Sequence, residues 1–118
     1  MEIIKKLGTP SEEEIKEMNP HYKEFKFPLL KPQKWDKIFP SRVDPLAIDL
    51  VAKALVYSPS KRIGAYEALS HPYFDELRDQ DLRLPNGNCI PDLFDFNQDE
   101  VKAIGKTLIQ SLIPTWYS

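Results

Sequence analysis

The spacing of apolar and polar positions predicts short helices joined by extended segments. Ile3, Ile4 and Leu7 fall on one face of a first helix over residues 1–7, which Gly8 ends. No N-capping residue precedes this helix, so we expect it to be cut from a longer helix. A second helix is predicted from Ser11, whose spacing to an acidic residue three positions later forms a capping box, to about residue 18.

In the middle of the chain the helical spacing of apolar residues is interrupted. Residues 21–34 alternate aromatic and charged side chains and then break at prolines, which predicts an extended segment with one buried face. Residues 35–39 are predicted to form a short turn with an aromatic side chain at each end. An Asp-Pro pair at positions 44 and 45 then predicts a helix reaching about Tyr57. Its apolar positions have the spacing of a core helix: Ala47, Leu50, Val51, Ala54 and Leu55.

Three further elements follow. We expect a short helix over residues 65–70, a helical turn over residues 74–77 and a chain turn at Asn86-Gly87. A capping box at residues 97–100 opens one final helix, whose apolar stripe is Val101, Ile104, Leu108 and Leu112. No pair of strands is apparent, so the predicted fold is mainly α with long ordered connections.

Composition narrows the classes of function. The 118 residues carry a net charge of −2, so no basic field attracts nucleic acid or an anionic membrane. Cys89 is the single cysteine, which excludes an internal disulfide and suits a reducing compartment. No apolar run has the length of a membrane span. We therefore expect a soluble intracellular protein.

Several motifs together carry a family resemblance. The first is Tyr57-Ser58-Pro59-Ser60-Lys61-Arg62-Ile63, followed by Ala65-Tyr66-Glu67-Ala68-Leu69 and His71-Pro72-Tyr73-Phe74, which resembles the last conserved block of the protein kinase C-lobe. Leu7-Gly8-Thr9-Pro10 before an acidic helix resembles an insert of the cyclin-dependent, mitogen-activated and glycogen synthase kinase group. Further segments resemble the glycogen synthase kinase-3 family over residues 2 to about 96: Glu17-Met18-Asn19-Pro20, Tyr22, Glu24-Phe25-Lys26-Phe27-Pro28, Phe74-Asp75-Glu76-Leu77-Arg78-Asp79 and Leu84-Pro85-Asn86-Gly87.

This resemblance implies the distal half of a kinase C-lobe with no N-lobe. Residues 1–77 would be the partial lobe, and residues 78–118 would be a C-terminal extension with a final helix. The parent family consists of serine/threonine kinases that use Mg-ATP and act in signalling in the cytoplasm and the nucleus. Here the Gly-rich loop, the Val-Ala-Ile-Lys strand and the His-Arg-Asp and Asp-Phe-Gly motifs are absent from the sequence. We therefore expect an inactive kinase fragment with no catalytic, cofactor-binding or metal-binding residue.

Arg62 is the structural residue that the resemblance indicates. In kinases the matching arginine forms a buried ion pair with the glutamate of the Ala-Pro-Glu motif, which this sequence lacks. A buried guanidinium without its carboxylate is costly. The alternative is a solvated arginine after a turn.

The resemblance also implies a groove that binds amphipathic helices of scaffold proteins such as Axin and FRAT. Its walls would be Ile3, Ile4 and Leu7 on one side and Tyr22, Phe25, Phe27 and Leu30 on the other. Phe25 and Phe27 have an alternative as core residues, which we favour for Phe27. Tyr22 fits the groove, because its hydroxyl needs contact with water, which the edge of a groove provides.

Two alternatives to a kinase fragment stay open: a module that binds scaffold peptides, and a partial gene product. The remainder of a kinase domain is a further expected partner. His21 and His71 lack cysteine partners at metal-ligand spacing, and we expect a structural hydrogen bond for His71. Cys89, with no neighbouring base, is expected to be an inert thiol.

Overall fold

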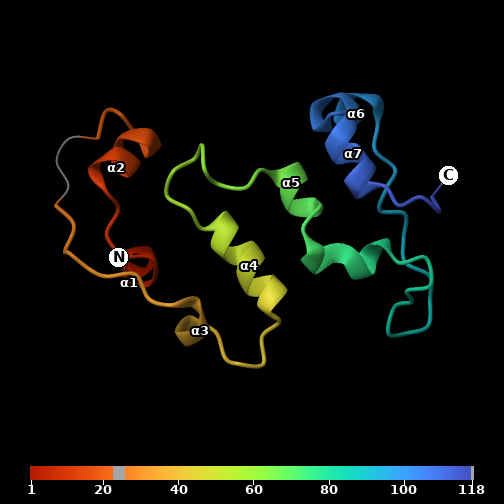
Figure 1. The fold of residues 1–118 in the computed structure, drawn as a ribbon, viewed down its shortest axis with the longest axis horizontal. Coiled ribbons are helices and arrows are strands. Elements are labelled where there is room, and N and C mark those ends of the chain that lie inside the picture. Colours follow the sequence, from red (N-terminus) through yellow and green to blue (C-terminus); the bar gives the residue numbers. More distant parts are fainter. Residues whose placement is uncertain (23–25, 118) are drawn as a thin grey trace. The chain divides into compact units, whose positions relative to one another are not determined.

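The computed structural model describes residues 1–22 and 26–117, and these residues are mainly helical, as predicted (Figure 1). The helices are α1 (Glu2–Leu7), α2 (Glu12–Met18), α3 (Trp35–Ile38), α4 (Pro45–Ala54), α5 (Ala65–Leu69), the 3-10 helix η1 (Pro72–Arg78), α6 (Gln98–Ile104) and α7 (Lys106–Leu112). Across the described residues, β pairing is limited to one isolated bridge between Arg83 and Cys89. None of these helices combines the length and the apolar character that crossing a bilayer requires.

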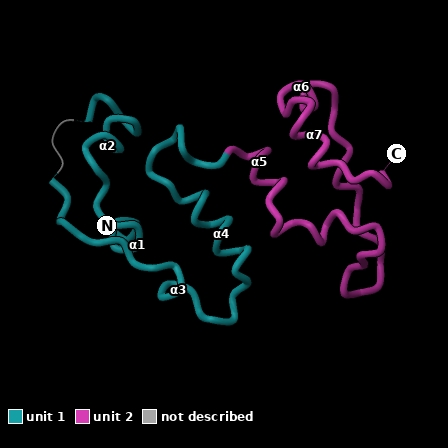
Figure 2. Tube along the Cα trace, viewed as in Figure 1, with its two compact units in different colours: residues 1–63 teal, residues 64–118 magenta. Residues whose placement is uncertain are grey.

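The chain divides into two compact units, residues 1–63 and residues 64–118 (Figure 2). Unit 1 contains α1 to α4, and unit 2 contains α5, η1, α6 and α7. The boundary between the units lies between Ile63 and Gly64 and reflects which residues pack together. The predicted boundary at residue 77 was based on the family resemblance, and it stays a prediction.

Local capping signals determine where α2 and α4 of unit 1 begin. The Ser11 hydroxyl accepts a hydrogen bond from the amide of Glu14 at 3.1 Å, and the Glu14 carboxylate accepts one from the Ser11 amide at 2.9 Å. This capping box and the end of α2 at Met18 confirm the prediction. The Asp44 carboxylate likewise caps α4 by accepting from the amide of Leu46 at 2.9 Å.

The extended segment after α2 returns along the end of α1. The amide of Gln33 donates to the carbonyl of Lys6 at 3.0 Å, and Thr9 and Leu30 exchange hydrogen bonds through the Thr9 amide and hydroxyl. Trp35 and Phe39 stand at the two ends of the short helix α3, as predicted, and their rings stack with centroids 6.1 Å apart. Residues 26–34 contain no helix, in line with the prediction. The predicted buried face is wrong, because Phe27 is half-buried and the other described residues of 21–34 are exposed.

The prediction for α4 was wrong in two respects. The helix ends at Ala54 instead of Tyr57, and none of its residues is buried, so it is not a core helix. Beyond α4 the backbone is held by other bonds: the amide of Ile63 donates to the carbonyl of Lys53 at 3.1 Å, and the Arg62 side chain occupies the carbonyls of Val56 and Tyr57. These contacts replace the helical hydrogen bonds that another turn would have used.

The single final helix predicted for unit 2 is two helices. Gly105 has φ +89°, a left-handed conformation that ends α6 and separates it from α7. Ile104 and Leu112 of the predicted stripe are buried, whereas Val101 is exposed. α7 lies against both α5 and α6. The capping box at Asn97 and Glu100 and the turn at Gly87 are confirmed.

Candidate functional site

Unit 1 contains a small apolar hollow beside the C-terminal end of α2. Its volume is about 240 Å³, and it is lined by Ile15, Met18, Asn19, Tyr22 and Phe27. Sites for drug-sized ligands start at roughly 300 Å³. The hollow therefore matches one or two apolar side chains of a binding partner better than a whole small molecule.

The hollow includes only part of the predicted groove. Tyr22 and Phe27 line it, but their neighbours come from α2 and not from α1. On α1, Ile4 is buried and Ile3 is 64% exposed, so these two residues do not share one face of the wall. Leu7 is half-buried, and Leu30 is tied through its backbone to Thr9. Phe25 lies outside the described residues.

Ile15 and Met18 are the apolar lining residues that sequence reasoning missed. They are the two apolar residues of α2 and stand three positions apart in an otherwise charged helix. That spacing places them on one helix face. The signal was therefore present in the sequence, although it is too short to distinguish a binding face from a core contact.

The loop over residues 57–62 joins α2 and the end of α1. The Tyr57 hydroxyl donates to the carbonyl of Gly8 at 2.6 Å. Burial, with the nearby carboxylate of Glu14 as a second cause, raises the pKa of Tyr57. Ser58 is only 1% exposed, and its hydroxyl donates to the carboxylate of Glu17 on α2.

Arg62 is an exposed residue that binds the backbone at the start of this loop. Its side chain is exposed, and its Nε and Nη2 atoms donate to the carbonyls of Val56 and Tyr57 at 3.0 and 3.3 Å. No carboxylate of the described residues forms an ion pair with it. The guanidinium therefore acts on the backbone of its own loop, and its charge stays in contact with water.

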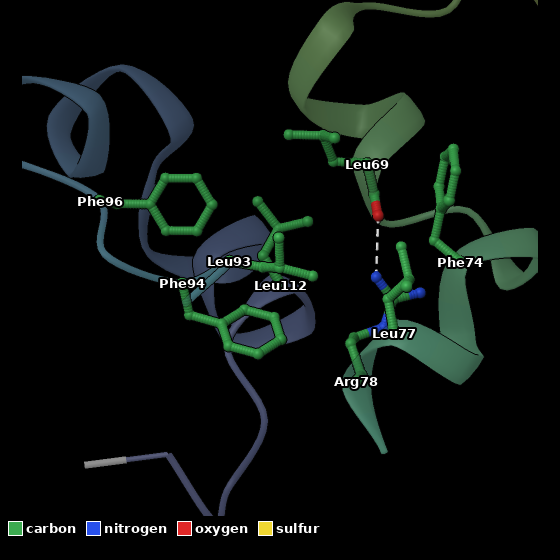
Figure 3. Close-up of a pocket in the computed structure, with 8 residues that line it drawn as sticks. All are labelled: Leu69, Phe74, Leu77, Arg78, Leu93, Phe94, Phe96 and Leu112. Atoms are coloured by element: carbon green, nitrogen blue, oxygen red, sulfur yellow. Dashed lines mark hydrogen bonds between the residues drawn. The ribbon is translucent and has the colours of Figure 1, made fainter. Parts of the chain in front are cut away.

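Unit 2 has an apolar pocket of about 180 Å³ (Figure 3). Side chains from α5 and η1 face side chains from residues 93–96 and α7 across it: Leu69, Phe74, Leu77 and Arg78 on one side, and Leu93, Phe94, Phe96 and Leu112 on the other. Within this unit, the segment leading to α6 thus packs, together with α7, against α5 and η1. The sequence had left that placement open.

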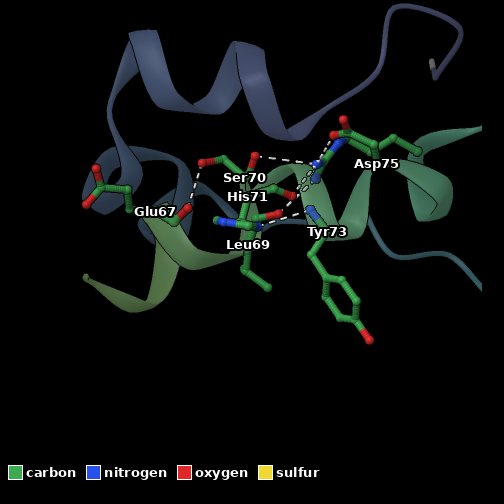
Figure 4. Close-up of polar contacts among 7 residues, drawn as sticks. Glu67, Leu69, Ser70, His71, Tyr73 and Asp75 are labelled. Atoms are coloured by element: carbon green, nitrogen blue, oxygen red, sulfur yellow. Dashed lines mark hydrogen bonds and ion pairs between the residues drawn. The ribbon is translucent and has the colours of Figure 1, made fainter. Parts of the chain in front are cut away.

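Arg78 organises the backbone around this pocket through Leu69, His71 and Asp75, which are labelled in Figure 4. Its side chain is 15% exposed, and it donates to the carbonyls of Leu69 at 2.8 Å and His71 at 3.0 Å while pairing with Asp75 at 2.6 Å. The Nδ1 atom of His71 accepts from the amide of Tyr73 at 3.0 Å, which confirms the structural hydrogen bond predicted for this histidine. Sequence reasoning did not single out Arg78, because its partners are backbone carbonyls, which leave no sequence signal.

Two aromatic residues near the end of the described chain, Trp116 and Tyr117, bind to other residues of unit 2. Trp116 donates from Nε1 to the carbonyl of Arg78 at 2.7 Å, and the Tyr117 hydroxyl bonds the carboxylate of Asp92. Both rings meet Phe94 edge to face. The hydrogen bond to Asp92, then burial, raises the pKa of Tyr117.

The described residues of the two units contain no cluster suited to a metal ion. Groups of three or more His, Cys, Asp or Glu side chains that could hold a metal ion do not occur in residues 1–22 and 26–117. Cys89 is a free, exposed thiol. A comparison with models of known protein families gives no match to this chain. The described structure does contain two apolar hollows, one in each unit, and polar contacts beside them.

Proposed function

We propose that this chain is the distal part of the large lobe of a serine/threonine kinase similar to the glycogen synthase kinase-3 family. In this proposal it supplies a scaffold and a docking surface, and phosphoryl transfer is not carried by these residues. Transfer from ATP needs a phosphate cradle, a lysine, metal-binding side chains and a group that orients the acceptor hydroxyl. The motifs that provide these groups in kinases are absent from the sequence.

One contact carries the proposal. Two motifs suggested a protein kinase independently, residues 7–10 and residues 57–63, and they stand far apart in the sequence. The hydrogen bond from Tyr57 to the carbonyl of Gly8 joins them. Motifs that belong to one conserved structural unit are expected to meet in this way, which supports a common origin in a kinase lobe.

The test of the catalytic part uses the purified chain with Mg-ATP. We expect no change in melting temperature and no phosphate transfer to a generic protein substrate. A clear stabilisation by Mg-ATP would overturn the proposal, because ligand binding to the folded state must raise stability by mass action.

A docking role has its own supporting observation, the hollow beside α2. An amphipathic helix places apolar side chains at i, i+3 and i+4, which suits a narrow apolar hollow with a polar edge. Met18 and Tyr22 leave apolar surface exposed at its rim, and Asn19 supplies a polar group. The proposed partner is therefore an amphipathic helix of a scaffold protein, the kind of partner that the family resemblance implies.

Fluorescence anisotropy with a labelled amphipathic helix, an Axin-type sequence, tests this role. Tyr22→Ala should weaken binding at least tenfold, a typical loss for an anchor residue at an interface. Tyr73→Ala is the matched control, because Tyr73 is 42% exposed and Tyr22 is 41% exposed, but Tyr73 lies in unit 2. Equal losses for the two variants, or no binding by the wild-type chain, would remove the docking role.

A further inference from the structure

Three oxygen-bearing side chains meet where α2 contacts the loop over residues 57–62. The Glu17 carboxylate accepts from the Ser58 hydroxyl and, at 3.3 Å, from the Ser60 hydroxyl. The two serine oxygens are 3.0 Å apart. Ser58 is buried, whereas Ser60 is exposed. One carboxylate therefore holds α2 to the loop, and a solvent-accessible hydroxyl lies within its hydrogen-bonding distance.

We propose that Ser60 is a phosphorylation site whose phosphate separates α2 from this loop. In the reaction, the Ser60 hydroxyl oxygen attacks the γ-phosphorus of ATP in the active site of a separate protein kinase. The bond from that phosphorus to the bridging oxygen breaks, ADP leaves, and the hydroxyl proton passes to the base of that kinase. Ser58 offers the same chemistry, but its burial excludes it from an enzyme's active site.

The phosphate turns the attractive contact between Ser60 and Glu17 into a repulsive one. A phosphoserine carries nearly two negative charges near neutral pH. The unmodified Ser60 hydroxyl donates to Glu17, but its phosphate ester has no proton to donate and repels the carboxylate. Glu14 is a second acidic group on the same helix. The repulsion therefore acts on the face of α2 that the loop holds.

The neighbouring cations oppose this effect only in part. Lys61 is exposed and follows Ser60 directly, so it can approach the phosphate from solvent. Arg62 already donates to the carbonyls of Val56 and Tyr57. An exposed ion pair is weak and screened by salt. The dominant change is the lost hydrogen bond to Glu17 together with repulsion between the two anions.

Release of α2 from the loop would also alter the hollow, because its lining residues Ile15 and Met18 lie on α2. Phosphorylation would therefore weaken helix docking, and this consequence alone rests on the proposed docking function. The release of α2 itself does not depend on any partner. A measurement on α2 can thus fail or succeed independently of a peptide-binding assay.

The experiment installs phosphoserine at position 60 of the full chain and follows amide hydrogen exchange of α2. We expect exchange in α2 to accelerate about fivefold, the factor that corresponds to one like-charge pair about 4 Å apart in water. The same phosphoserine in a Glu17→Gln background should give little acceleration, because the amide oxygen still accepts hydrogen bonds and carries no charge. Phosphoserine at position 41 is the control, since Ser41 is also exposed, in the same unit and followed by a basic residue.

Three results would overturn the proposal: unchanged exchange with phosphoserine at 60, equal acceleration in the Glu17→Gln background, or equal acceleration from position 41. The acceptor role is tested separately with Mg-ATP and a serine kinase that prefers basic residues after the acceptor. Mass spectrometry should place the phosphate on Ser60. Incorporation at Ser58 instead, or none at Ser60, would contradict the assignment.

Discussion

The phenolic oxygen of Tyr57 lies 2.6 Å from the carbonyl oxygen of Gly8 and donates a hydrogen bond to it across 49 positions of sequence. Gly8 has φ +84°, the left-handed conformation that ends α1. The carbonyl that Tyr57 reaches thus belongs to a backbone position with few allowed residues. This bond connects the end of α1 to the loop that follows α4.

Tyr57→Phe removes this hydrogen bond and leaves the ring in place. We expect the free energy of unfolding to fall by about 1 kcal/mol, the usual net value of a partly buried hydrogen bond. Urea denaturation measures the change. Tyr66→Phe is the control, because the described residues provide no hydrogen-bond partner for that hydroxyl, and its effect should stay within roughly 0.5 kcal/mol.

Alkaline pH should destabilise the protein through its tyrosines. The pKa of Tyr57 is raised in the folded state by burial and by Glu14, and that of Tyr117 by its hydrogen bond to Asp92. A raised pKa means that the folded state holds the proton more tightly than the unfolded state. The stabilisation is therefore complete below the ordinary pKa of 10.0 and is lost as pH rises through the folded pKa.

Urea denaturation at a series of pH values between about 9 and 12 checks this expectation. Stability should decline with pH in the wild-type chain and decline less in the Tyr57→Phe Tyr117→Phe double variant. Identical slopes in the two proteins would show that these hydroxyls do not cause the alkaline loss.

Gly8→Ala should destabilise unit 1 more than the same change at Gly105 destabilises unit 2. Both glycines have positive φ, so alanine is strained at either position by about 1 kcal/mol or more. At Gly8 the added methyl would also lie 2.8 Å from the backbone nitrogen of Pro32, whereas at Gly105 it meets open space. Hydrogen exchange resolved by unit separates the two effects, and equal costs would contradict the close approach of Pro32.

Arg78→Lys should destabilise unit 2 although it preserves the charge. A lysine ammonium cannot reproduce the planar set of donors that serves Leu69, His71 and Asp75 together. Leaving partly buried carbonyls without donors costs about 1–3 kcal/mol. Arg83→Lys is the matched control, because Arg83 is exposed and donates to the adjacent carbonyl of Leu82. Thermal denaturation should show little change for that control, and an equal loss would argue against the role of Arg78.

The beginnings of α2, α4 and α6 were predictable because their causes are local. The capping boxes at Ser11 and Asn97 use residues three positions apart, and the Asp44 cap uses the next two residues. The end of α4 was not predictable in this way. It depends on Arg62, Ile63 and the loop between them and α4, whose hydrogen bonds form only after the chain turns back.

The candidate site likewise contains residues that the sequence identifies and contacts that depend on the folded structure. Tyr22 and Phe27 could be named from their position in an aromatic segment, but their neighbours Ile15 and Met18 follow from how that segment returns past α2. Arg62 could be named from its motif, but whether its guanidinium is buried in an ion pair or exposed over its own loop depends on which carboxylates come near it.

The sequence by itself determined the mainly helical fold, most helix starts, the non-helical course of residues 26–34 and the absence of kinase catalytic motifs, because each depends on neighbouring residues or on residue identity alone. Only the tertiary structure decided that Gly105 divides the last helix, that no residue of α4 is buried, and that Glu17 meets Ser58. These outcomes depend on side chains that become neighbours only when distant segments pack, and the energy of such contacts leaves no periodic pattern in the chain.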